Sequence, residues 1–430
     1  MQEALAGTRG TAARVTRRPE AGLLWTDVWF LAGIAIAALL AVDPMQWELA
    51  SNTFARHLVL FVSLPAVMMA LLLRLALPSA MKRPRSGPKI RPLVDSLAAA
   101  WPLALFAPLV LCGSLYARVF LGADTTFLNY GLYVAMLFAS AAMVLQCPAP
   151  LSLLRGYFAI LLAAALVMSA FLIAYAGKRQ VYHEQIFLVI PMAALFFAGN
   201  ASAPVRWGAA AFFLLMGWCS HKYTSYLVAA LTAAYLAVFI WVPRLARGDA
   251  LGWLSAVYWG ALGFLATGAA AIAYAMRGGT DQPTGNLDFR LHTYQAAWDR
   301  FLDSPLWGNF YAREATEKFR LFDIGIAHNV LPTHSDLLDL LANGGLLGFG
   351  LCALGVLAIA AVAWRGALRP GLIGRPEARY AHALALLSLA AIVTCAFNPI
   401  LLQPPMAALA WSNLGMLLGL SLRAGAGPDA

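Results

Sequence analysis

The sequence predicts an all-α polytopic integral membrane protein with about 12 transmembrane helices and one long polar loop that contains short helices. Of the 430 residues, 61% are hydrophobic and 12% are charged, whereas soluble domains contain roughly 25% charged residues. Apolar runs of about 20 residues, long enough to cross a bilayer, recur along almost the whole chain. The net charge of +10 therefore indicates positive loops facing the cytoplasm rather than a nucleic-acid surface.

Hydropathy divides the chain into five parts. A tail over 1–23 precedes nine spans over 24–276, a polar loop over 277–343, three spans over 344–422 and a tail over 423–430. The sixth and seventh spans are short, and the third contains two prolines. The predicted spans start near Leu24, His57, Leu97, Phe127, Gly156, Ile186, Trp207, Tyr223, Gly252, Gly344, Tyr380 and Pro405.

The basic residues give the orientation. Lys and Arg are more frequent in the two tails and the even-numbered connections than in the odd-numbered ones, and positive charge favours the cytoplasmic side. The basic tail over 1–23 leads into a full-length span rather than a short signal core, so we expect a cytoplasmic tail and no cleaved signal peptide. Both termini are expected in the cytoplasm.

The long outer loop over 277–343 is the expected location of the functional site, because function concentrates in loops on a rigid scaffold. Leu291, Tyr294, Trp298 and Phe301 fall at helical spacing and predict an amphipathic helix that ends at 303–305. Such a helix fits three arrangements: lying on the membrane surface, covering a cavity, or packing on the bundle.

Several cations are predicted on the same outer side as this loop. They are Lys178 and Arg179 after the fifth span, Lys222 after the seventh, and Arg290 at the start of the loop helix. The positive-inside rule disfavours basic residues in short outer loops. Arginine and lysine are the usual binders of phosphate oxygens, so an anionic substrate is one explanation; contact with lipid headgroups or loop acids is the other.

Other kinds of site are not indicated. No Walker loop and no GxGxxG motif after a strand occurs, which argues against a nucleotide site. The loop has no DxD pair that would hold a divalent metal, so we expect no cofactor and no metal. All five cysteines fall in or beside apolar runs without CxxC spacing, and we interpret them as small buried hydrophobic residues.

The stretch from Thr333 to Asp336 reads as the start of a helix. Thr333 and Asp336 form a predicted capping-box pair, with Asp336 and Asp339 in the first turn. His334 then lies at a helix N-terminus, whose partial positive charge disfavours imidazolium and leaves a neutral base that can accept a proton. A histidine that only caps the turn is the alternative, and the aspartates are interpreted as helix-start residues rather than catalytic acids.

This segment resembles the bacterial O-antigen ligases and the related O-antigen polymerases. Their signature is a histidine, usually followed by Asn, with Leu four residues on and glycines eleven and fourteen residues on. From His334 these positions hold Leu338, Gly345 and Gly348, whereas counting from His328 fails at all three. Ser335 replaces the usual Asn, and Asn343 replaces a usual Glu.

Two further features carry the resemblance. The family has an arginine that opens a loop helix ending in a Pro-Leu-x-Gly turn, which corresponds to Arg290 and the turn over 305–308. It also has a Ser-Arg pair at the end of a mid-chain span. His221 and Lys222 stand at that place here, which keeps the charge but loses the bidentate guanidinium.

The resemblance implies a GT-C-like glycosyltransferase at the periplasmic face of the inner membrane. It implies transfer of O-antigen from undecaprenyl pyrophosphate to a sugar hydroxyl of lipid A–core. The reaction would invert the anomeric configuration and use no metal. His334 would act as the base, and the pyrophosphate would be bound by Arg290, Lys222, Arg179 and Lys178. An O-antigen polymerase or a protein O-oligosaccharyltransferase is an alternative. A lipid-linked sugar transporter is disfavoured, because Arg74 is the main charge at membrane depth and no internal repeat is seen.

Overall fold

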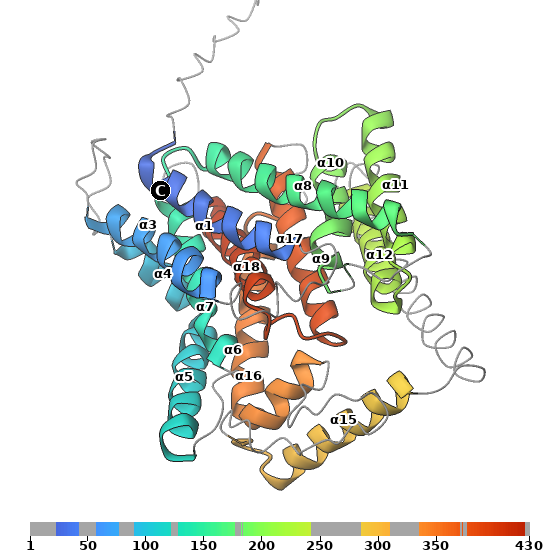
Figure 1. The fold of residues 1–430 in the computed structure, drawn as a ribbon. Helices are drawn as coiled ribbons and strands as arrows, with labels where there is room; N and C mark the ends of the chain where they lie inside the picture. The colour runs from blue at the N-terminus through green and yellow to red at the C-terminus, as the bar shows by residue number, and fades with distance from the viewer. Residues whose placement is uncertain are drawn as a thin grey trace, which may run out of the picture.

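The computed structural model describes residues 23–42, 57–76, 90–121, 128–176, 182, 184–241, 285–309, 335–369, 372 and 376–425, with the backbone alone for 121 and 285–292. Within these ranges every regular element is a helix. Eight described helical stretches are long and apolar enough to cross a membrane. The predicted all-α polytopic membrane protein is confirmed (Figure 1).

Eleven of the predicted spans correspond to described helices. The ninth, near Gly252, lies outside the described residues, so the count of twelve and the five-part division remain predictions. Two further helices are α4 (Arg91–Ala99) and α15 (Gly285–Asp303). The matching elements are α1 (Trp25–Ala41), η1 with α3 (Val59–Ser63, Leu64–Ala76), α5 (Trp101–Leu121), α6 with α7 (Leu128–Leu132, Val134–Gln146), α8 (Pro150–Ala174), α9 with η2 and α10 (Ile186–Val189, Ile190–Met192, Ala193–Phe197), α11 (Ala203–Cys219), α12 with η3 (Tyr223–Tyr235, Leu236–Trp241), α16 (Asp336–Arg365), α17 (Pro376–Cys395) and α18 (Pro404–Gly425).

Helix α18 forms the centre of the bundle and is buried along nearly its whole length (Figure 1). Gly415 and Gly419 form a small-xxx-small pair on the face that meets α7. A Cβ at Gly415 would collide with the carbonyl oxygen of Leu137, and one at Gly419 would lie 2.6 Å from that of Ala141. The two glycines therefore allow the backbones of α7 and α18 to approach closely, as is common between membrane helices.

Arg74, the charge that the sequence places within a span, forms a buried ion pair. Its guanidinium lies 3.1 Å from the Asp27 carboxylate, and the two side chains are 8% and 0% exposed. A second guanidinium nitrogen donates to the carbonyl oxygen of Gln146 at 3.1 Å. The pair therefore joins α1, α3 and α7, and it gives Arg74 a structural role.

We expect Arg74→Met to destabilise the fold by about 3–5 kcal/mol, because it leaves the Asp27 carboxylate buried without its partner charge. Denaturant-induced unfolding of the purified protein in detergent measures this free energy. The Arg74→Met/Asp27→Asn double variant removes both charges and should recover much of the loss. A double variant that is less stable than Arg74→Met would contradict the ion-pair interpretation.

The same end of the bundle holds the end of α18. Arg423 donates to the carbonyl oxygens of Val144 and Cys147 at 3.3 and 2.8 Å, next to the residue that Arg74 contacts. The start of α1 and the end of α18 therefore lie at one end of the molecule, at the top of Figure 1, while α15 and the start of α16 lie at the bottom.

Candidate active site

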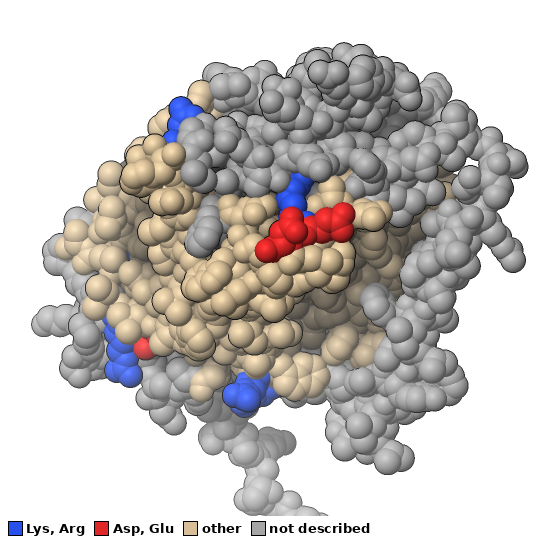
Figure 2. All heavy atoms as spheres, turned by 90° about the horizontal axis from the view of Figure 1, so that it is seen from below, with Lys and Arg blue, Asp and Glu red and all other residues tan. Residues whose placement is uncertain are grey.

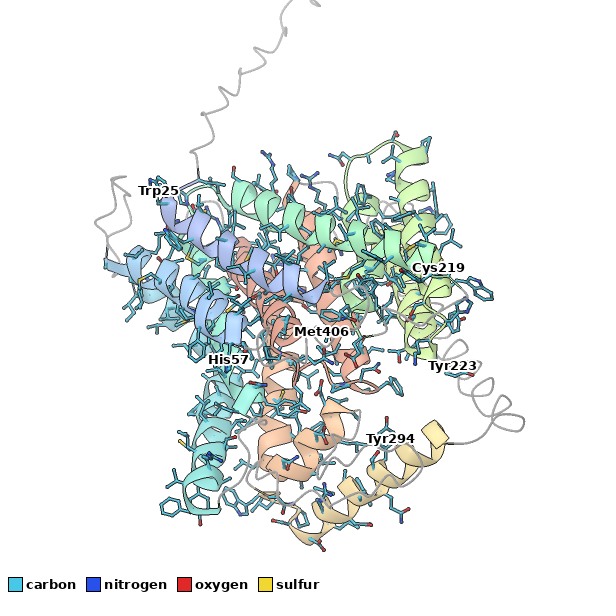
Figure 3. All side chains as sticks on the ribbon, in the orientation of Figure 1. Trp25, His57, Cys219, Tyr223, Tyr294 and Met406 are labelled. Atoms are coloured by element: carbon cyan, nitrogen blue, oxygen red, sulfur yellow. The ribbon has the colours of Figure 1, made fainter. Side chains whose placement is uncertain are left out.

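The candidate site lies at the end of the bundle opposite to the start of α1. This end brings together α15, the starts of α16, α12 and α6, and the turn over 396–403 between α17 and α18. Tyr223 at the start of α12 and Tyr294 on α15 both lie toward this end (Figure 3). Viewed from this side, the described atoms belong mostly to uncharged residues (Figure 2).

Helix α16 begins at Asp336, and Ser335 is its N-cap. The Ser335 hydroxyl accepts a hydrogen bond from the backbone N–H of Leu338 at 3.4 Å. The predicted capping-box pair of Thr333 and Asp336 is therefore wrong, because the cap lies two residues later. His334 directly precedes this cap and lies outside the described residues, so its role stays a prediction.

The Asp336 side chain contacts other elements instead of its own helix start. It is fully buried and accepts one hydrogen bond from the Tyr130 hydroxyl at 2.8 Å and another from the backbone N–H of Leu401 at 2.7 Å. A buried carboxylate requires such donors. Asp336 therefore fixes the start of α16 to α6 and to the 396–403 turn, two residues after His334.

A second contact joins α16 to the turn that follows α15. Helix α16 is interrupted at Gly345, which has φ +58° and ψ −164°. The interruption exposes backbone groups that the turn satisfies: the N–H of Leu346 donates to Pro305 O at 2.8 Å, and the N–H of Leu347 donates to Leu306 O at 3.1 Å. The predicted span start near Gly344 thus corresponds to this kink inside α16.

The turn itself requires a glycine where it meets the kink. Gly308 has φ +59°, and a Cβ there would lie 2.5 Å from the carbonyl carbon of Asn343. A Cβ on Gly345 would lie 2.5 Å from the carbonyl of Leu306. Because both glycines have left-handed backbones and neither site has room for a side chain, the Pro-Leu-x-Gly turn and the first signature glycine form one packed unit.

We expect Gly345→Ala to reduce activity at least about tenfold, because both the positive φ and the contact with Leu306 oppose a side chain. The rate of product formation by purified protein measures the loss. Gly350→Ala on the same helix is the matched control, since nothing lies within 4 Å of a Cβ there. Equal activities of the two variants would contradict a role for the kink.

Helix α15 ends at Asp303, as the sequence predicts. Among its described side chains, over 293–303, Thr293, Ala297, Arg300 and Phe301 are buried, whereas Trp298 is 48% exposed. Phe301 of the predicted apolar face is thus buried and Trp298 is not, so the choice among the three predicted arrangements of this helix stays open. The backbone of Arg290 lies in α15, but the direction of its side chain is not described, so its role stays a prediction.

Lys222 is the N-cap residue of α12 and follows a tight turn in which His221 has φ +52°. It is half-buried. Thr224, two residues later, accepts a hydrogen bond from Asn398 Nδ2 at 3.2 Å, which ties this helix start to the 396–403 turn. Lys178, Arg179 and His328 lie outside the described residues, and the assignment of Lys178 and Arg179 to a phosphate site stays a prediction.

The cysteines and possible metal ligands add no second site to the described part of the chain. No three His, Cys, Asp or Glu side chains gather there as ligands; metal-free chemistry remains a prediction. Cys147, Cys352 and Cys395 are buried, as expected, whereas Cys219 is partly exposed and Cys112 is exposed on α5.

The sequence did not indicate all of the residues that support the site. Tyr130, Asn398 and Leu401 lie far along the chain from the segments they contact, and no local pattern connects them. Gly308 and Gly345 could be found from the sequence, because both belong to the family-like motifs. The spacing of the motifs did not show that the two glycines pack against each other.

Comparison with known proteins agrees with these motifs. Residues 208–353 match the family model described as O-antigen ligase. The matched range begins in α11, contains Lys222, Arg290 and His334, and ends in α16. A search of curated proteins found no match. The family covers O-antigen ligases and polymerases, which are glycosyltransferase-like enzymes. Over residues 208–353, this chain is therefore similar to the O-antigen ligase family.

Proposed function

We propose that this protein is an O-antigen ligase, which transfers O-antigen polysaccharide from undecaprenyl pyrophosphate to a sugar hydroxyl of lipid A–core. One observation carries the proposal. Three segments of the matched range, at the starts of α12 and α16 and along α15, gather at the end of the bundle opposite to the start of α1. They carry the candidate cation Lys222, the residue after His334, and the backbone of Arg290.

The proposed reaction is a single displacement at the anomeric carbon. His334 removes the proton from the acceptor hydroxyl as that oxygen attacks, and the bond to the pyrophosphate oxygen breaks. The pyrophosphate leaves with its charge stabilised by Arg290, Lys222, Arg179 and Lys178, which act as fixed cations. The leaving group is a weak base, so no general acid is required, and the anomeric configuration inverts.

The substrates explain why such an enzyme is built almost wholly from membrane helices. Both donor and acceptor are lipids, so the reacting groups meet at the membrane surface while the lipid chains stay in the bilayer. We place the protein in the inner membrane with both termini in the cytoplasm and the site in the periplasm. The basic residues of the inner connections support this orientation, as does the shared end of α1 and α18.

Complementation of a ligase-null strain tests the proposal. A ligase-null strain makes bare core, and this protein is expected to restore a ladder of lipopolysaccharide bands on a gel. A polymerase-null strain makes core with one repeat, and the protein is expected to leave that pattern unchanged. Complementation of the polymerase-null strain alone would replace the ligase proposal with the polymerase function that the family also covers.

A metal requirement is tested with the purified protein. The proposed chemistry uses fixed cations, so product formation should continue in EDTA. Complete inhibition by EDTA that a divalent ion reverses would remove the metal-free mechanism, while leaving the identity of the substrates untouched.

A further inference from the structure

The turn over 396–403 joins α17 to α18, and its middle part is buried, although connections usually lie on the surface. Asn398, Pro399, Ile400 and Leu401 are all buried. In Figure 1 this segment lies near the centre of the molecule, between the lower end of α17 and α16, and Met406 marks the start of α18 beside it in Figure 3. A buried turn needs partners for its backbone groups, and these partners reveal its role.

Two of its backbone groups bond to side chains of distant elements. The N–H of Leu401 donates to Asp336 of α16 at 2.7 Å. The carbonyl oxygen of Leu402 accepts from Asn129 Nδ2 of α6 at 3.0 Å, across 273 residues of sequence. The turn thus fixes the start of α16 on one side and the start of α6 on the other.

Two of its side chains bond to further elements. Asn398 Nδ2 donates to the hydroxyl of Thr224 in the first turn of α12 at 3.2 Å. Gln403 donates to the carboxylate of Glu184, which lies two residues before α9. Pro399 within the turn and Pro404 at the start of α18 restrict the backbone, so these side chains project from a rigid segment.

Three of the four contacts, those to Asp336, Thr224 and Glu184, share a pattern. Asp336 lies two residues after His334, and Thr224 lies two residues after Lys222. Glu184 lies in the connection that also contains Lys178 and Arg179. The turn therefore bonds to the three chain segments that carry the proposed base and most of the proposed phosphate-binding cations, although it lies outside the matched range of 208–353.

We propose that the 396–403 turn is the positioning element of the active site, and that Asn398 and Thr224 are positioning residues for the donor pyrophosphate. The identity of the donor rests on the proposed function. The turn fixes the positions of four chain segments relative to one another: the starts of α6, α12 and α16 and the segment before α9. The base and the cations can then act on the same substrate. A displacement of about 1 Å at such a site lowers rates by about 100-fold.

The pair formed by Asn398 and Thr224 allows a matched test. Thr224→Val keeps the shape of the side chain and removes the acceptor hydroxyl, whereas Thr224→Ser keeps the hydroxyl. We expect Thr224→Val to lower kcat/KM for the lipid-linked donor about tenfold, the effect of losing one hydrogen bond. The KM for the lipid A–core acceptor should not change, and Thr224→Ser should stay within about twofold of the wild type.

A double-mutant cycle isolates the contact. Asn398→Ala should reduce donor kcat/KM by a similar factor, and Asn398→Ala/Thr224→Val should be no worse than the weaker single variant, since both remove the same bond. Independent, multiplicative losses would overturn the proposal. So would a lower melting temperature of Thr224→Val with unchanged donor kinetics, because that result would show a purely structural role.

A binding measurement separates this inference from the proposed function. Undecaprenyl pyrophosphate is titrated onto wild-type protein in nanodiscs, and the shift in melting temperature reports binding. If the wild type binds this lipid but forms no ligated product, the ligase proposal fails. The positioning inference then stands if Thr224→Val weakens binding and Thr224→Ser does not, and it is overturned if all three proteins bind equally.

Discussion

His334→Ala is expected to lower transfer of O-antigen by about 10² to 10⁴-fold, the usual range for loss of a general base. The alanine cannot accept the proton of the acceptor hydroxyl, while the hydrogen bonds that Ser335 and Asp336 accept should be kept. The lipopolysaccharide ladder of a complemented ligase-null strain reports the activity. An immunoblot of the membrane fraction shows that the variant is present at the wild-type level.

His328→Ala is the matched control for that variant, because it removes the same side chain six residues earlier in the same loop. We expect a mild effect, since the signature leucine and glycines are spaced from His334 and not from His328. A normal ladder from His334→Ala would eliminate the base assignment. A bare core from His328→Ala with a normal ladder from His334→Ala would transfer the role to His328.

Arg290→Lys is expected to lower activity at least about 100-fold, comparable to the loss of one transition-state donor. Lysine keeps the positive charge but not the planar pair of N–H donors that binds two phosphate oxygens at once. The loss should appear in kcat/KM for the donor with purified protein. This result would show that the geometry of the guanidinium matters as well as its charge.

Arg313→Lys provides the comparison for Arg290→Lys, because it makes the same change in the same loop at a position with no assigned role. It should keep near wild-type activity. If Arg290→Lys were fully active, Arg290 would have a structural role, and stabilisation of the leaving group would rest on Lys222 and the pair Lys178 and Arg179.

The sequence predicted the helices well and the contacts among their ends poorly. Apolar runs are a local property, so the starts of α1, α12 and α18 fall within one residue of their predicted places at Leu24, Tyr223 and Pro405. The helix α15 was predicted from another local property, the helical spacing of Tyr294, Trp298 and Phe301. Its orientation was not, because hydropathy does not show that Trp298 faces outward while Arg300 is buried.

The start of α16 illustrates what local patterns miss. Thr333 and Asp336 have capping-box spacing, yet Asp336 is bonded to Tyr130 and Leu401, which lie 206 and 65 residues away. Tertiary donors therefore outcompete the local cap at this position. The kink at Gly345 likewise depends on a turn that precedes it by more than thirty residues, so a predicted boundary near Gly344 was in fact a bend within one helix.

The reaction of the purified protein with both substrates tests the central claim most directly. The protein in nanodiscs is mixed with O-antigen on undecaprenyl pyrophosphate and with lipid A–core, and the products are separated on a gel and identified by mass. The account predicts O-antigen covalently joined to lipid A–core, formed by the wild type and not by His334→Ala. Lengthened O-antigen that remains on the lipid pyrophosphate, or no covalent product at all, would contradict it.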